Sequence, residues 1–387
     1  MGPLTMGAPY QSAWMREDQR IFRDSVRRFV ENEFVPRQAR WQRQNGPDPE
    51  AWPAAGRAGL LLPDIPAEYG GGGGDFTHQA VVREELLGAG VQFGCGVHGI
   101  VAHYLLAYGS EAQKRHWLPA MARGDLVGAI AMSEPAAGSD LQGIATTARR
   151  VGDEYVINGS KAFVTNGRHA GLVCVAVKTD TAAPGSRGMA LIVAETTGLT
   201  GYRRGRPLEK IGMHGQDTCP LYFDDVRVPA ANLLGGEEGH GFAQMLAQLP
   251  YERLGIAVDA VATAERAVAI TTHYVLERMA FGKALIEFQN TRFELAECRT
   301  EAMIGRVFLD YCIGRFLAGR LDDVTAAMAK LWLTDCQCRV VDKCLQLHGG
   351  YGYMTEYPIA RMWADSRVQR IYAGSNEIMK EIIGWSL

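Results

Sequence analysis

The sequence predicts an α+β protein of several domains, with an all-helical N-terminal domain, a strand-rich middle domain and a C-terminal bundle of helices. Apolar residues recur at helical spacing in the first and last thirds of the chain, whereas short β-branched runs fill the part between them. The 387 residues, 47% of them apolar, exceed what one hydrophobic core usually serves. We place the domains at residues 1–126, 127–237 and 238–387.

The first domain is predicted from one-sided helical patterns. Between Glu17 and Pro36 the apolar residues follow steps of three and four, which places them on one helical face, and Pro36 is expected to end this helix. Helical patterns continue over Ala80–Leu87, His98–Tyr108 and Ala112–Ala122. The glycine run Gly70–Gly74 follows no strand and starts no periodic helix, so it predicts a mobile surface loop and not a phosphate-binding loop.

The middle domain is predicted from short β-branched runs that Gly, Pro and Asp separate. Leu172–Val177 and Met189–Val193 are the clearest strands. Asn158 and Gly159 form an Asn-Gly pair inside another β-rich run. Because such a pair supplies two residues with positive φ, it predicts a tight hairpin turn.

Long helical patterns return in the last third of the chain. They cover Glu252–Arg278, Arg292–Leu317 and Asp322–Leu347, and Gly349–Gly350 is the stop signal of the last one. Three or four such helices form a bundle. We find no internal repeat, no heptad array and no low-complexity linker.

Charge and composition exclude several classes of function. The net charge of −3 offers no general basic surface for nucleic acid or an anionic membrane. The first ten residues lack the features of a signal peptide, and no stretch reaches the roughly 18 apolar residues of a membrane span. We therefore expect a cytoplasmic protein that binds no nucleic acid and does not insert into a membrane.

The eight cysteines and the missing motifs narrow the chemistry further. The cysteines form no C-x-x-C pair and have no histidine at metal-finger spacing, so we interpret them as packing residues and expect no metal site. The common hydrolase, P-loop and Rossmann signatures are absent. Any dinucleotide cofactor must therefore be held by a different architecture.

Four segments together resemble the acyl-CoA dehydrogenase family over essentially the whole chain. They are Ala131–Asp140, Phe163–Gly167, Arg278–Lys283 with Gln289, and Gln346–Tyr353 running to Ile371–Ile378. Each segment alone is equally typical of an ordinary turn, strand or helix surface, but their joint occurrence in this order is not. The resemblance implies a middle β-barrel-like domain, a C-terminal four-helix bundle and a homotetramer built as a dimer of dimers.

The resemblance also implies non-covalently bound FAD and assigns residues to it. It places Ser133, Thr165 and Phe163 at the flavin ring and Ser139 beside flavin and substrate. It places Arg278, Phe281 and Gln289 at the pyrophosphate and adenosine of FAD, and Ser375 and Glu377 near its phosphates and adenine. Gln346 and Gly350 are expected to contact the FAD of a neighbouring subunit. Two positions depart from the common pattern, since many relatives have Trp at 163 and Thr at 375.

The acyl-CoA dehydrogenase reaction that the resemblance implies also requires a catalytic base. Removing the α-proton of an acyl thioester needs a positioned carboxylate, and many relatives carry it at the position of Ala373. Here Glu252, in Leu249–Leu254, resembles the base of the isovaleryl and long-chain branches, and we predict that Pro250 opens or kinks a helix and so directs this base. The alternative is an ordinary first-turn acid. We expect a raised pKa for Glu252 in an apolar pocket. The backbone N–H of Ala373 is expected to bind the thioester carbonyl.

Substrate contacts follow from the same resemblance. Arg253 and Tyr372 match substrate-binding positions, and Gly94 and Gly96 fall where relatives line the floor of the acyl cavity. Their small size favours a medium, long or branched chain, although close helix packing explains glycines equally well. The expected product is the trans-2-enoyl-CoA, with electrons passed to an electron-transferring flavoprotein. The alternatives are a flavin oxidase or monooxygenase of the same fold, a redox-silent acyl-CoA binding protein and a purely structural helical assembly.

Overall fold

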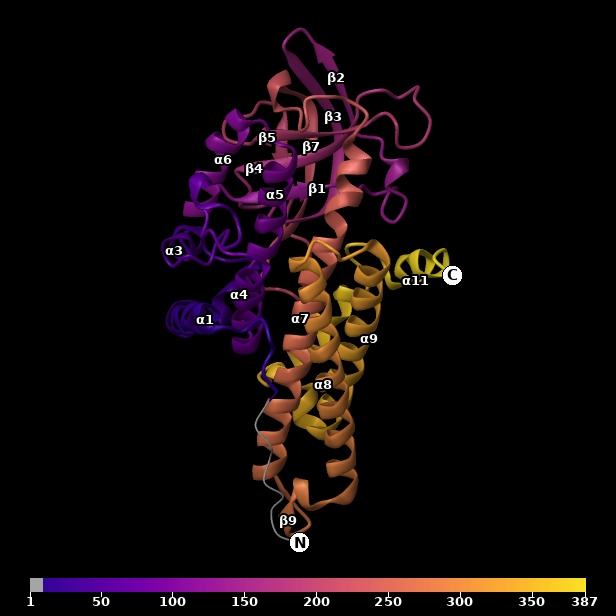
Figure 1. The fold of residues 1–387 in the computed structure, drawn as a ribbon. Helices are drawn as coiled ribbons and strands as arrows, with labels where there is room; N and C mark the ends of the chain where they lie inside the picture. The colour runs from indigo at the N-terminus through magenta and orange to yellow at the C-terminus, as the bar shows by residue number, and fades with distance from the viewer. Residues whose placement is uncertain (1–9) are drawn as a thin grey trace.

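A computed structural model describes residues 10–387 and divides them into three parts (Figure 1). The N-terminal helices lie beside the upper part of the long helix α7, a β-sheet lies at the top, and a helical bundle extends below. The fold class predicted from the sequence is confirmed. Separate hydrophobic clusters serve the helical parts and the sheet, which agrees with the expectation of several cores.

Six α-helices form the N-terminal part. They are α1 (Glu17–Phe29), α2 (Gln38–Gln44), α3 (Ala51–Arg57), α4 (Phe76–Ala89), α5 (Cys95–Tyr108) and α6 (Glu111–Arg123). Pro36 does not end the first helix, which changes into a π-turn at Val30–Phe34 and a 3₁₀ turn at Val35–Arg37 before α2 begins. Proline is tolerated there because the first turn of a helix needs no N–H donor from it.

The Gly70–Gly74 loop lies at the surface, but its glycines serve close packing. A Cβ added at Gly71 would lie 2.2 Å from the carbonyl oxygen of Ile65, and one at Gly72 would lie 2.7 Å from that of Pro63. Backbone hydrogen bonds of 2.9 Å also hold Gly73 to Ile65 and Gly74 to Pro63. The surface position agrees with the prediction, and glycine is needed here because larger residues do not fit. The expectation that no helix starts directly after the glycines is wrong, because α4 begins at Phe76 with Asp75 as its N-cap.

The middle part is a seven-stranded sheet. Its strands are β1 (Gly128–Ala131), β2 (Thr147–Val151), β3 (Glu154–Thr165), β4 (Leu172–Lys178), β5 (Met189–Glu195), β6 (Tyr202–Arg204) and β7 (Thr218–Pro229). The order is β1-β4-β2-β3-β7-β6, with β5 paired to β4. The two strands predicted most clearly correspond to β4 and β5. Both are buried along almost their whole length.

The hairpin predicted at Asn158-Gly159 is wrong. β3 runs straight through this pair, and the turn from β2 to β3 contains Gly152 instead, with a φ of 61°. Gly159, with a φ of 147°, lies at an irregularity in the pairing of β3 with β7. The Asn158 side chain exchanges hydrogen bonds of 2.9 Å with Asp225 across that irregularity. Pairing on both sides of β3 thus outweighs the local turn preference.

The C-terminal part is the predicted bundle. Its long helices are α7 (Gly241–Glu277), α8 (Gln289–Leu317) and α9 (Asp323–Leu347), with the short helices α10 (Pro358–Ser366) and α11 (Asn376–Gly384) packed on α9. The strands β8 (Met279–Ala280) and β9 (Lys283–Ala284) form a hairpin between α7 and α8. Pro250 lies inside α7 and does not open it, so Glu252 is not a first-turn acid. The helix begins at Gly241, which packs so closely against Ala190 of β5 that an added Cβ would lie 2.6 Å from the Ala190 carbonyl carbon.

The cysteines are packing residues, as predicted. Seven of the eight are buried, and Cys338 is half-buried. Across residues 10–387 no group of His, Cys, Asp or Glu side chains is arranged to hold a metal ion. No helix in this same range combines the length and the apolar character needed to cross a membrane.

Gly159 provides a test of the strand irregularity. A Cβ added there would lie 2.5 Å from Oγ1 of Thr146, whereas one at Gly152 meets nothing within 4 Å. We predict that Gly159→Ala lowers the free energy of unfolding by about 1–3 kcal/mol through overpacking. Gly152→Ala, the control, carries only the strain of positive φ, about 1 kcal/mol. Calorimetric melting temperatures compare the two, and equal melting temperatures would contradict this assignment.

Candidate active site

Glu252 is a buried carboxylate on α7. Its exposed fraction is 8%, and the Tyr104 hydroxyl on α5 donates a hydrogen bond of 3.1 Å to Glu252 Oε1. Burial raises the pKa of the Glu252 carboxyl to about 7, although the Tyr104 hydrogen bond and the Arg253 charge act in the opposite direction. The raised pKa expected from the sequence is confirmed. A carboxyl group with a pKa near neutrality can both take up and release a proton.

The loop that contains Ala373 lies next to this part of α7. Ala373 has a φ of 52°, and the backbone of Gly374 approaches the Arg253 guanidinium closely enough that an added Cβ would lie 3.8 Å from Nη2. Lys330 Nζ donates hydrogen bonds of 2.8 Å to the Gly374 carbonyl and to Asn376 Oδ1. The Ala373 N–H has no acceptor among the described residues. The structure thus brings the loop that carries this free backbone donor against Arg253, the residue that follows Glu252.

Arg253 is buried and forms no ion pair within residues 10–387, although the charges of Asp323 and Glu252 act on its guanidinium. Its exposed fraction is 3%, its Nε atom has no hydrogen-bond partner within residues 10–387, and burial lowers the pKa of its guanidinium. A buried cation that lacks hydrogen bonds is costly, so this site is suited to an anionic or hydrogen-bonding ligand. Tyr372 lies at the edge of the same loop with 37% of its surface exposed. Burial raises the pKa of its hydroxyl.

The C-terminal helix α11 begins just after this loop. Ser375 precedes it, and Glu377 lies in its first turn. Hydrogen bonds from its own backbone N–H and from Ser375 lower the pKa of the exposed Glu377 carboxyl. Both residues are therefore close to Ala373 in sequence and space.

Three predicted flavin contacts lie together on the sheet. Ala162 N–H donates to the Ser133 carbonyl at 2.9 Å, which joins the segment after β1 to β3. Phe163, with a φ of 56°, exposes 69% of its surface, and Thr165 is half-buried two residues later. Ser139 lies in an exposed bend of the loop after Ser133. An exposed aromatic ring beside half-buried hydroxyl groups fits the flat, polar-edged ring of a flavin.

A buried ion pair holds the segment that carries Ser133 against β3. Lys161 Nζ lies 2.7 Å from Glu134 Oε1 and also donates to the Met132 carbonyl at 3.0 Å. The Glu134 carboxylate accepts two further hydrogen bonds from the backbone N–H groups of Ala145 and Thr146. Because each charge is satisfied, the pair can hold the loop that carries Ser133 in one position. Sequence analysis did not identify this pair.

The other predicted cofactor residues lie at the far end of the bundle. Arg278, which ends α7, has its guanidinium 5.2 Å from the centroid of the Tyr351 ring. Phe281 is 96% exposed and has a φ of 50° in the tight turn of the β8–β9 hairpin. The remaining three, Gln289, Gln346 and Gly350, are also exposed. At 1.5 Å per residue, Arg278 lies roughly 40 Å along α7 from Glu252. The predicted contacts therefore form two separate groups within one chain.

Gly94 and Gly96 do not leave room for an acyl chain in the way predicted. A Cβ at Gly94 would lie 1.8 Å from Asn166 Oδ1, and one at Gly96 would lie 2.5 Å from Arg83 Nη2. Asn166 Nδ2 donates hydrogen bonds to the carbonyls of Gly94 and Gly128 at 2.9 and 3.1 Å. Protein side chains therefore fill the space beside both glycines. Arg83, Tyr104 and Lys330 were not predicted from the sequence. Each is a polar residue within a predicted helix, and that alone does not indicate a functional role.

Comparison with known proteins identifies the family. The acyl-CoA dehydrogenase N-terminal, middle and C-terminal domains match residues 16–125, 129–226 and 239–387. The long-chain specific acyl-CoA dehydrogenase of Sus scrofa is 45% identical over 94% of this chain and 85% of its own length. The isovaleryl-CoA dehydrogenase of Pongo abelii is 33% identical, over 96% and 88% respectively.

A solved structure agrees with these matches. The crystal structure of an acyl-CoA dehydrogenase from Geobacillus kaustophilus superposes with a TM-score of 0.95 at 46% identity and covers 97% of this chain and 99% of that one. The sequence-based resemblance and the expected fold, with its helical, β half-barrel and helical domains, are therefore confirmed. The chain belongs to the acyl-CoA dehydrogenase family and is an FAD-dependent oxidoreductase that acts on CH–CH groups.

Proposed function

We propose that Glu252 removes the α-proton of a saturated acyl-CoA and that the product is the trans-2-enoyl-CoA. The observation that carries this proposal is the buried Glu252 carboxyl, with its pKa raised to about 7. The loop that contains Ala373 approaches the next residue of α7, Arg253. At neutral pH a large fraction of such a group is ionised and can accept a proton. Ala373 itself has no carboxylate, so Glu252 is the base that the chemistry requires.

Each neighbouring group has a role in the proton transfer. Tyr104 orients the Glu252 carboxylate through its hydrogen bond. The Ala373 N–H stabilises the negative charge that develops on the thioester oxygen, an effect of about 3 kcal/mol in comparable sites. Lys330 keeps this N–H in place by holding Gly374. Bound FAD supplies the acceptor for the hydride that leaves the β-carbon. Arg253 binds the CoA moiety beside these groups.

We assign the cofactor contacts to two subunits. Ser133, Ser139, Phe163 and Thr165 hold the flavin of their own chain, with Ser375 and Glu377 near it. The group at the far end of the bundle, which is Arg278, Phe281, Gln289, Gln346 and Gly350, serves the FAD of a neighbouring subunit, because roughly 40 Å of α7 separates it from Glu252. This extends the sequence-based assignment, which gave only Gln346 and Gly350 to the neighbour.

Replacement of Glu252 tests the proposed base. We predict that Glu252→Gln keeps its flavin but loses roughly 10²- to 10⁴-fold in the rate of flavin reduction, the usual contribution of a general base. Anaerobic mixing with saturated acyl-CoA thioesters, followed by flavin absorbance, measures this rate. Glu277→Gln, which changes an exposed acid on the same helix, is the control. A normal rate in Glu252→Gln with bound flavin would contradict the proposal.

The pH profile tests the role of Tyr104. Because the base must be ionised, kcat/KM is expected to rise with pH through about 7. The Tyr104 hydrogen bond lowers the pKa of Glu252, so Tyr104→Phe is expected to move this rise to higher pH by roughly one unit or less. Tyr108→Phe removes a neighbouring hydroxyl that bonds to Gln244 instead and is the control. A shift to lower pH would exclude this role.

The acyl chain and the electron acceptor belong to the same proposal. Likeness to long-chain relatives supports a medium or long chain. The family resemblance supports an electron-transferring flavoprotein as acceptor, whereas the cytoplasmic location stays a prediction from the sequence. A flavin oxidase or monooxygenase is the alternative, and it would consume oxygen rapidly. The redox-silent alternative is less favourable because it leaves the buried Glu252 carboxyl without a task.

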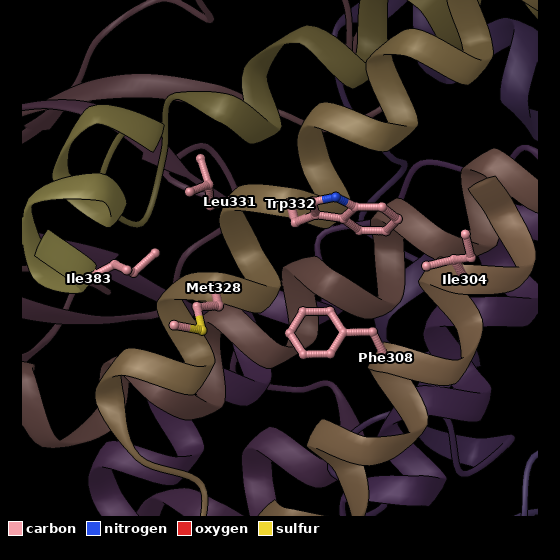
Figure 2. A pocket seen from close by; sticks show the side chains of 6 residues that line it. All are labelled: Ile304, Phe308, Met328, Leu331, Trp332 and Ile383. Carbon is pink, nitrogen blue, oxygen red and sulfur yellow. The ribbon is translucent and has the colours of Figure 1, made fainter. Parts of the chain in front are cut away.

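We further propose that the protein is a homotetramer. An apolar groove opens between α8, α9 and α11 (Figure 2), and its lining is Ile304, Phe308, Met328, Leu331, Trp332 and Ile383. Beside it, Ile304, Val307 and Tyr311 of α8 are 52, 49 and 54% exposed at helical spacing. Contiguous exposed apolar surface of this kind is typical of a protein interface. A second copy of the chain is the occupant that the family resemblance favours.

A charge in the groove tests this assembly. We predict that Ile304→Lys lowers the mass in solution from that of a tetramer to that of a dimer or monomer, because an interface core rejects an unpaired charge. Light scattering after size-exclusion chromatography measures the mass. Ile21→Lys changes a 62% exposed apolar residue on α1, outside the groove, and should leave the mass unchanged. An unchanged tetramer in Ile304→Lys would exclude the groove as the interface.

A further inference from the structure

A buried ion pair between α4 and α7 has no role in the proposed proton transfer. Arg83 Nη1 lies 2.8 Å from Asp259 Oδ2, and the two side chains are 11% and 17% exposed. Burial raises the pKa of Asp259, whereas the Arg83 charge lowers it. Neither residue was identified from the sequence. Their position relative to Glu252 decides what they can contact.

The pair lies one to two helical turns from Glu252 on the same face of α7. Gly255 and Asp259 follow Glu252 by three and seven residues, which are the spacings of neighbours on one helical face. A Cβ added at Gly255 would lie 3.0 Å from Cζ of Arg83. The Arg83 guanidinium therefore fills the space beside Gly255 that a larger side chain would occupy. Gly255 lies roughly 4.5 Å along α7 from Glu252.

Two further elements meet the same guanidinium. Gly96 on α5 leaves room for Arg83 Nη2, as described above. Burial and the Asp259 charge raise the pKa of the Tyr372 hydroxyl, while the Arg83 charge lowers it, so Tyr372 lies within electrostatic range of both groups. Tyr372 directly precedes Ala373. The Arg83 guanidinium thus lies among α4, α5, α7 and the loop of Tyr372 and Ala373. If the thioester binds at Ala373 as proposed, the acyl tail extends towards this region beyond its β-carbon.

Arg83 leaves most of its hydrogen-bonding capacity unused. A guanidinium has five N–H donors, and among the described residues only the bond from Nη1 to Asp259 is formed. The Nε atom is buried without a partner. Unpaired buried donors are costly, and a ligand oxygen would satisfy them.

The charge balance determines which oxygen fits. Arg83 and Asp259 already compensate each other, so a carboxylate added to the acyl tail would place an uncompensated negative charge in a buried site. A hydroxyl or carbonyl oxygen accepts from Arg83 without adding charge. A purely hydrocarbon tail leaves the Arg83 donors unsatisfied. Neutral oxygen is therefore the chemistry that this site favours.

We propose that Arg83 is a specificity-determining residue and that the preferred substrates are acyl-CoA thioesters whose tail carries a hydroxyl or carbonyl oxygen a few carbons beyond the β-carbon. This inference rests on the proposed function, because it takes Glu252 and Ala373 as the position of the reacting end. It narrows the substrate class from acyl chains in general to oxygenated ones.

Matched substrates test the preference. Hexanoyl-CoA is compared with 5-oxohexanoyl-CoA, 5-hydroxyhexanoyl-CoA and the ω-carboxylate adipoyl-CoA, and with octanoyl analogues oxygenated at successive carbons. We expect kcat/KM for the best oxo or hydroxy substrate to exceed that of the plain chain by roughly 10- to 100-fold, the effect of a hydrogen bond from a charged donor. Flavin reduced by plain chains with no such preference would overturn the inference and leave the proposed function intact.

Two variants separate recognition from structural effects. Arg83→Met/Asp259→Leu removes both charges together, which is less damaging than leaving one buried charge unpaired, and should bring the ratio of oxygenated to plain substrate close to one. Asp259→Asn keeps Arg83 but leaves its charge uncompensated, and should shift the preference towards adipoyl-CoA. Flavin content verifies that each variant is assembled. An unchanged ratio in the double variant, or no gain with adipoyl-CoA in Asp259→Asn, would overturn the role of Arg83.

Discussion

The continuity of α7 is the constraint on which the rest of the structure depends. This helix of 37 residues starts against β5, carries Glu252 between the N-terminal helices and the C-terminal loop, and ends at Arg278 beside the β8–β9 hairpin (Figure 1). A rigid element of that length fixes the base relative to the sheet that bears Phe163. It also separates Arg278 from Glu252 by roughly 40 Å, which is why we propose that Arg278 serves the cofactor of a neighbouring subunit.

The chemistry of the site comes from burial more than from charge pairing. Glu252 and Arg253 are adjacent in α7, yet burial raises the pKa of the first and lowers that of the second, so burial opposes the charged form of both groups. In contrast, the pairs Lys161–Glu134 and Lys330–Asn376 are satisfied and hold the segments around Ser133 and Ala373. At this site the unpaired Arg253 Nε faces the proposed ligand region, and the satisfied groups hold the surrounding segments.

Much of this arrangement could be predicted from the sequence. The long helices follow from strong periodicity. The proposed base follows from chemical need, since Ala373 lacks a carboxylate and Glu252 lies in a segment that resembles relatives with the base there. The turn at Asn158-Gly159 could not be excluded locally, because pairing with two neighbouring strands overrides it. The role of Gly96 was also beyond sequence reasoning, since it depends on Arg83 approaching from another helix. A contact between residues of different helices leaves no repeating pattern in the sequence from which it could be predicted.

The central claim is that Glu252 removes the α-proton. An acyl-CoA analogue with sulfur in place of the β-carbon cannot lose hydride, so exchange of its α-hydrogens in deuterium oxide reports proton removal alone. Mass spectrometry of 3-thiaoctanoyl-CoA incubated with the flavin-loaded enzyme measures this exchange. We predict exchange with the wild type and a loss of at least roughly 100-fold with Glu252→Gln. Equal exchange rates in the two proteins would contradict the account and place the base elsewhere.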